Sequence, residues 1–197
     1  MAYLVEKRNI EAVVVGASAG GVHALLDLFS GLPAHFRLPI VTVLHLSSGR
    51  DSRLPEIFRH RLSMNVREAA DKEKIKPSTL YFAGPGYHLS VEADRSFSLS
   101  CEEPLNYSRP SIDVLMASAA DAYGTSLAGI LLTGANPDGS DGMAYIKERG
   151  GFTVVQDPAE AEVPTMPESA IRRSQPSLIL TLAEIRNLLL ELNDTSC

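Results

Sequence analysis

The chain has 197 residues, of which 45% are hydrophobic and 21% charged, a composition typical of globular rather than disordered proteins. Its 18 basic and 24 acidic side chains leave a formal net charge of −6, which argues against a nucleic-acid partner bound by phosphate neutralisation. Two cysteines cannot form a disulfide framework, and no apolar run is long enough to span a membrane. We therefore expect one cytoplasmic domain over residues 1–197, which is long enough to bury a core without disulfides or a structural metal.

Short apolar runs alternate along the chain with segments that carry apolar residues at helical spacing. The predicted strands are 12–15, 40–44, 127–132, 152–155 and 178–180, and the predicted helices are 22–32, 54–62, 112–123, 142–149, 167–173 and 182–192. This alternation predicts an α/β fold in which a doubly wound, mostly parallel sheet is flanked by helices and connected by right-handed crossovers.

One stretch, near residues 79–101, departs from this alternation. Three short runs, 80–83, 88–92 and 97–101, have the composition of strands and are separated by turn residues. We predict that they form antiparallel strands joined by turns, as an excursion at the edge of the sheet.

A glycine-rich turn, GASAGG at residues 16–21, follows the first predicted strand and precedes a predicted helix. A sharp strand-to-helix turn is where a nucleophilic serine such as Ser18 is placed, and its glycines let a substrate carbonyl or a phosphate approach the backbone. Ser18 is equally compatible with a turn or helix-cap role. A dinucleotide site is disfavoured, because the second strand ends in His45 rather than an acidic residue and the glycine fingerprint is incomplete.

Two further polar residues follow predicted strands: His45 after 40–44, and Asp138 in the loop after 127–132. Loops at the carboxyl ends of parallel strands converge, so Ser18, His45 and Asp138 are expected to meet. Together they supply the nucleophile, the base and the acceptor that orients the base in serine acyl transfer. Individually, His45 is compatible with a satisfied loop histidine and Asp138 with an Asx turn. A metal site that adds Asp141 is disfavoured, because no paired histidine spacing supports it.

In these residues the sequence resembles the catalytic domain of the CheB-type protein-glutamate methylesterase and glutaminase family of chemotaxis. The resemblance extends from about residue 13 to 192. It is carried by six segments in order: GASAGG (16–21), LHL (44–46), AGPGYH (83–88), RPSIDVL (109–115), LTGANPDG (132–139) and GM (142–143). It implies that Ser18 is the nucleophile, His45 the general base and Asp138 the residue that orients it.

The resemblance further implies that the chain demethylates glutamyl methyl esters, and deamidates glutamines, on the cytoplasmic helical bundle of methyl-accepting chemotaxis receptors, without a cofactor. Backbone N–H groups near Ser18 and Ala135 would hold the oxyanion, and Ala19, Gly20 and Arg109 would lie near the substrate. Arg109 is also compatible with a solvated surface charge.

Three positions depart from the family pattern. Ala19 stands where a hydroxyl residue is usual, Ala135 where a large residue such as methionine is frequent, and Pro137 where asparagine is frequent. The departures imply a lower rate and leave a second possibility open, a catalytically weak module that binds receptors or a signalling partner. Family members usually carry a receiver domain ahead of this one, and we expect none in residues 1–197. The resemblance therefore implies an unrestrained domain, a fragment of a longer protein, or a member that a separate partner controls.

Overall fold

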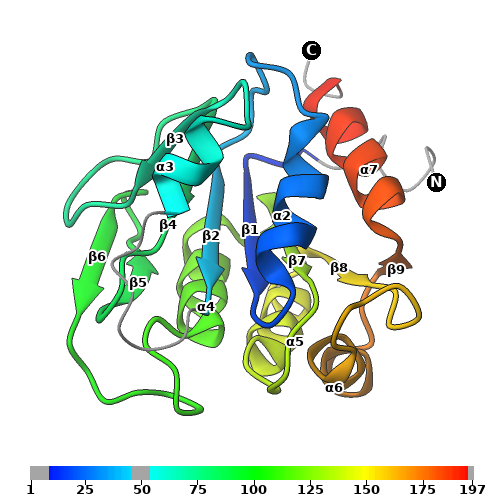
Figure 1. Cartoon of the computed structure of the whole chain (residues 1–197). Coiled ribbons are helices and arrows are strands. Elements are labelled where there is room, and N and C mark those ends of the chain that lie inside the picture. The colour runs from blue at the N-terminus through cyan, green and yellow to red at the C-terminus, as the bar shows by residue number, and fades with distance from the viewer. Residues whose placement is uncertain (1–8, 46–53, 195–197) are drawn as a thin grey trace.

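A seven-stranded parallel sheet lies between two layers of helices in the computed structural model, which describes residues 9–45 and 54–194 (Figure 1). The strand order is β3-β4-β2-β1-β7-β8-β9. The strands are β1 (Ala12–Ala17), β2 (Ile40–Leu44), β3 (Asn65–Glu68), β4 (Thr79–Phe82), β7 (Leu127–Leu131), β8 (Phe152–Gln156) and β9 (Leu178–Leu180). All adjacent pairs are parallel, which confirms the predicted α/β fold.

The predicted excursion is confirmed only in part. β5 (His88–Val91) and β6 (Phe97–Ser100) form an antiparallel hairpin, as expected. The prediction for residues 80–83 is wrong, because β4 pairs in parallel with both β2 and β3 inside the main sheet. Its four residues are all buried, as in a central parallel strand. β3 was not predicted, because three of its four residues are exposed and it lacks an apolar run.

Each face of the sheet is covered by its own set of helices. On one face lie α2 (Gly21–Ser30), α3 (Leu54–Arg59) and α7 (Leu182–Asp194); on the other lie α4 (Ile112–Tyr123), α5 (Ser140–Glu148) and α6 (Thr165–Ser174), together with the β5-β6 hairpin. β1 divides the two cores, because Val13 and Val15 pack into the first while Ala12 and Val14 pack into the second. Within the described ranges, no helix is long and apolar enough to cross a membrane.

The position of the site follows from the sheet topology. β1 lies between β2 and β7, and the chain continues from β1 to β2 on one side and from β7 to β8 on the other. Ligands bind at such a switch point, beyond the carboxyl ends of the strands. The loops that leave β1, β2 and β7 there carry Ser18, His45 and Asp138.

Gly16, near the end of β1, has no room for a side chain. An added Cβ would lie 2.4 Å from Cγ2 of Ile112 and 2.8 Å from Cδ1 of Leu131, and both of those side chains are fully buried. We expect Gly16→Ala to lower the free energy of unfolding by about 1–3 kcal/mol through overpacking, measured by urea denaturation. Gly31→Ala is the matched control, since its Cβ meets the flexible Arg186 side chain. Equal losses in the two variants would contradict this account.

Candidate active site

Ser18 begins the tight turn between β1 and α2. Its N–H donates to the carbonyl of Thr133 at 3.0 Å, and its own carbonyl accepts the N–H of Gly21 at 2.8 Å. Gly20 has a φ of 77°, in the left-handed region, and a Cβ there would lie 2.8 Å from Cβ of Glu162. Glycine is therefore required at residue 20 by both conformation and space. The turn fixes the serine backbone and leaves its side chain half-buried at the end of the sheet.

Thr133 connects this turn to the loops that follow β7 and β8. Its hydroxyl donates to the carbonyl of Ala19 and accepts the N–H of Val163, both at 2.9 Å. Its own N–H donates to Oε1 of the buried Gln156 at 2.8 Å. Three loops thus share the hydrogen bonds of one threonine, which holds the turn of Ser18 in a fixed relation to the loop of Asp138.

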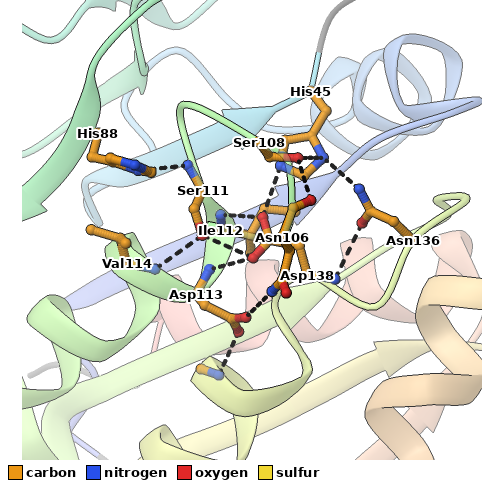
Figure 2. Close-up of polar contacts among 11 residues, drawn as sticks. His45, His88, Asn106, Ser108, Ser111, Ile112, Asp113, Val114, Asn136 and Asp138 are labelled. Atoms are coloured by element: carbon orange, nitrogen blue, oxygen red, sulfur yellow. Dashed lines mark hydrogen bonds and ion pairs between the residues drawn. The ribbon is translucent and has the colours of Figure 1, made fainter. Parts of the chain in front are cut away.

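Asp138 is fully buried and lies against the N-terminus of α4. Oδ2 accepts the N–H of Ile112 at 2.7 Å, while Oδ1 accepts the hydroxyl of Ser111 at 2.8 Å and the N–H of Asp113 at 3.2 Å (Figure 2). Burial raises the pKa of this carboxyl, but the contacts with His45, Ile112 and Ser111 outweigh it and lower the pKa to about 2. A helix N-terminus also favours negative charge. Asp138 is therefore ionised at neutral pH.

His45 contacts this carboxylate. Its Nε2 lies 2.9 Å from Oδ2 of Asp138, although the alignment falls short of a linear hydrogen bond. An ionised acceptor at this distance favours the ring tautomer with its proton on Nε2, which leaves a lone pair on Nδ1. That second nitrogen lies 3.4 Å from Nδ2 of Asn136 and 3.5 Å from Oγ of Ser108 (Figure 2). The predicted pair of His45 and Asp138 is thus in direct contact.

Ser18 lies beside this pair without a direct hydrogen bond to it. Ala17 of β1 is paired with Leu44 of β2, and the N–H of His45 donates to the carbonyl of Ala17 at 3.0 Å. Ser18 and His45 therefore leave two adjacent strands side by side, and adjacent strands lie about 4.8 Å apart. In the part of the chain that the structure describes, the Ser18 hydroxyl makes no hydrogen bond to the ring. Catalytic contacts of this kind often tighten only when substrate binds.

Of the residues expected around the substrate, two have backbone N–H groups that can reach a ligand, whereas the side chain of Arg109 is hydrogen-bonded to its own loop. Within residues 9–45 and 54–194, the N–H groups of Ala19 and Ala135 donate to no acceptor, so both are free for a ligand oxygen. The exposed Arg109 donates to the carbonyls of Cys101 and Glu102, both at 3.0 Å, and so holds its own loop. Its contact with substrate stays a prediction.

Several residues that support the pair were given no role in the site by sequence reasoning, which expected a structural role at the hairpin for His88. His88 accepts the N–H of Ser111 on Nδ1 at 3.2 Å, so its Nε2 carries the proton and donates to the carbonyl of Glu103 at 3.1 Å. The histidine thereby positions the serine that binds Asp138. His88 and Ser111 lie in the segments 83–88 and 109–115 that carry the resemblance, but their roles depend on contacts between loops that the sequence does not display.

Asp113 is a second buried carboxyl beside the first. Oδ1 accepts the N–H of Gly142 at 2.7 Å, and Oδ2 accepts Nδ2 of Asn106 at 3.2 Å (Figure 2). Burial raises the pKa of Asp113 to about 7; the bond from Gly142 opposes this shift, and the negative charge of Asp138 adds to it. The two neighbouring carboxyls thus differ in protonation: below about pH 7, Asp138 is ionised and Asp113 is protonated.

Comparison with known proteins adds independent findings. The sequence profile of the family described as CheB methylesterase matches residues 13–189. A Leptospira interrogans protein, provisionally named a protein-glutamate methylesterase/protein-glutamine glutaminase, is 43% identical over 188 residues, which cover 95% of this chain and 97% of that one. A relative with the same activity in its name, from Carboxydothermus hydrogenoformans, is 37% identical over 91% of this chain but only 54% of its own length.

A solved structure is similar over nearly the whole chain. The crystal structure of the Thermotoga maritima CheB methylesterase catalytic domain superposes with a TM-score of 0.89 at 31% sequence identity. The match covers 93% of this chain and 98% of that domain.

The protonated Asp113 gives stability a definite pH dependence. Its native pKa of about 7 exceeds the ordinary value of 3.8, so between these values the native state binds more protons and stability falls as pH rises. In Asp113→Asn the side chain cannot ionise, so this fall in stability with rising pH disappears. We expect the variant to gain roughly 1 kcal/mol or more over the wild type between pH 5 and pH 8, measured by urea denaturation. Asp121→Asn, on the exposed face of the same helix, is the control. If the difference in free energy of unfolding between Asp113→Asn and the wild type does not grow with pH, the raised pKa of Asp113 is contradicted.

Proposed function

The chain belongs to the CheB methylesterase family of protein-glutamate methylesterases and protein-glutamine glutaminases, and from that premise we propose that Ser18, His45 and Asp138 carry out the hydrolysis in this chain. One observation carries the proposal: His45 lies 2.9 Å from the buried, ionised Asp138, and it leaves β2 beside the serine turn of β1. Nucleophile, base and orienting carboxylate are the parts that serine acyl transfer requires.

The proposed mechanism assigns each proton to an atom. Oγ of Ser18 attacks the γ-carbonyl carbon of a glutamyl methyl ester while Nδ1 of His45 takes the hydroxyl proton. Asp138, which stays ionised, stabilises the imidazolium. The N–H groups of Ala19 and Ala135 donate to the oxyanion. When the tetrahedral intermediate collapses, the proton of His45 passes to the departing methoxide and methanol leaves.

Hydrolysis of the acyl-enzyme completes the cycle. His45 removes a proton from water, the hydroxide attacks the acyl carbon, and the proton returns to Ser18 as glutamate is released. A glutamine side chain follows the same route with ammonia as the leaving group.

The proposed substrate is the cytoplasmic helical bundle of a methyl-accepting chemotaxis receptor, which places the reaction in the cytoplasm. The loop that carries Ser108 beside His45 also presents two exposed apolar side chains, Leu105 and Tyr107. An extended protein surface such as a receptor helix would contact both. On this proposal residues 1–197 act as one catalytic domain.

Loss of the nucleophile tests the proposal directly. We expect Ser18→Ala to lower methanol release from a methylated chemoreceptor cytoplasmic fragment by at least about 10³-fold, because members of a triad act as a unit. Methanol release is measured over time. Ser63→Ala, an exposed serine outside the site, is the matched control and should keep the wild-type rate.

The outcome separates two functions. If the folded wild-type chain releases no methanol from several receptor fragments yet binds them, and Ser18→Ala binds equally well, a receptor-binding module replaces the enzyme as the better account.

A further inference from the structure

The side chain of Asn136 contacts both the ring of His45 and the backbone of Asp138. Nδ2 lies 3.4 Å from Nδ1 of His45, and Oδ1 accepts the N–H of Asp138 at 3.2 Å (Figure 2). Asn136 is half-buried and belongs to the segment 132–139, where sequence analysis gave roles to its neighbours but none to it. Its two contacts tie His45 to the Asp138 backbone, independently of the contact between ring and carboxylate.

The chemistry of the two ends fixes which amide atom faces the ring. The N–H of Asp138 can only donate, so the amide atom opposite it is the oxygen, and the NH₂ group faces His45. On the far side of the ring, the ionised Asp138 carboxylate lies 2.9 Å from Nε2 and favours the proton on that nitrogen. Nδ1 therefore faces a donor and must offer a lone pair. A ring protonated on both nitrogens would set its Nδ1–H against the NH₂ group.

We infer that Asn136 is a positioning residue that holds His45 as the neutral tautomer with an unprotonated Nδ1. The inference rests on the proposed function, in which Nδ1 takes the proton of Ser18. A donor at Nδ1 lowers the basicity of that nitrogen, which keeps it unprotonated in the resting enzyme and favours the onward transfer of the proton to the leaving group. The amide must move aside when the hydroxyl of Ser18 approaches the ring. The Ser108 hydroxyl, 3.5 Å from the same nitrogen, can donate or accept and so accommodates both ring states.

Asn136→Asp reverses one contact and keeps the other. A carboxylate oxygen still accepts the N–H of Asp138, but the second oxygen replaces the donor at Nδ1 and favours the protonated ring. Asn136→Ala removes both contacts and serves as a second variant should the aspartate variant fail to fold. Asn65→Asp, exposed at the sheet edge on β3, makes the same change of charge away from the site.

The first readout is the pH dependence of kcat/KM for methanol release from a methylated chemoreceptor fragment. We expect the midpoint of its acid limb to rise by about one pH unit or more in Asn136→Asp. The rise should be smaller in Asn136→Ala and absent in Asn65→Asp. A merely structural role would lower the rate at every pH without moving the midpoint, and that result would overturn the inference.

The second readout needs no substrate. Nitrogen-15 NMR of labelled histidine, with His45 assigned by its loss in His45→Gln, reports which ring nitrogens carry protons. We expect an unprotonated Nδ1 in the wild type at pH 8 and a protonated Nδ1 that persists to higher pH in Asn136→Asp. Identical ring states in both proteins would refute the role of Asn136. This readout decides the inference even if the wild-type chain hydrolyses no ester, an outcome that would count against the proposed function alone.

Discussion

The buried charge of Asp138 is the constraint around which the neighbouring elements are arranged. A carboxylate with no access to water is stable only when fixed donors replace its hydration shell. Here the first turn of α4 supplies N–H groups, Ser111 supplies a hydroxyl, and His45 supplies the ring contact. His88 from the β5-β6 hairpin in turn holds the N–H of Ser111. The hairpin, the helix and the loop after β7 therefore pack together around one negative charge.

Hydrophobic periodicity predicted most of the helices and strands, and the elements that it predicted wrongly or missed have physical explanations. Periodicity identifies amphipathic helices, and the length and composition of a short apolar run favour a buried strand, but a run such as 80–82 carries no information on strand direction. β3 was not predicted because a strand at the edge of the sheet needs few apolar residues. Ser18, His45 and Asp138 could be placed together because all three follow parallel strands. Asn136 and Asp113 could not be interpreted, since their roles depend on burial and on contacts across loops.

The two adjacent carboxyls show how environment, rather than residue type, sets protonation. Asp138 receives the helix N–H groups and the histidine, whereas Asp113 is buried with one strong donor, the N–H of Gly142. Only one of the two can be ionised at low cost, because like charges at close range raise the energy of the doubly charged state. Below about pH 7 a neutral Asp113 therefore leaves the negative charge on Asp138, beside the ring of His45.

The hydrogen bonds of Thr133 have a consequence for how the molecule opens. The amide of Ser18 is bonded to the carbonyl of Thr133, whose own amide is bonded to the buried Gln156 at the end of β8. Exchange of the Ser18 amide with solvent deuterium thus requires the turn to separate from the loop after β7. The turn of Ser18 is thus hydrogen-bonded to the loop after β7, which is itself bonded to the end of β8, and we expect its amide to exchange more slowly than those of the surface loops.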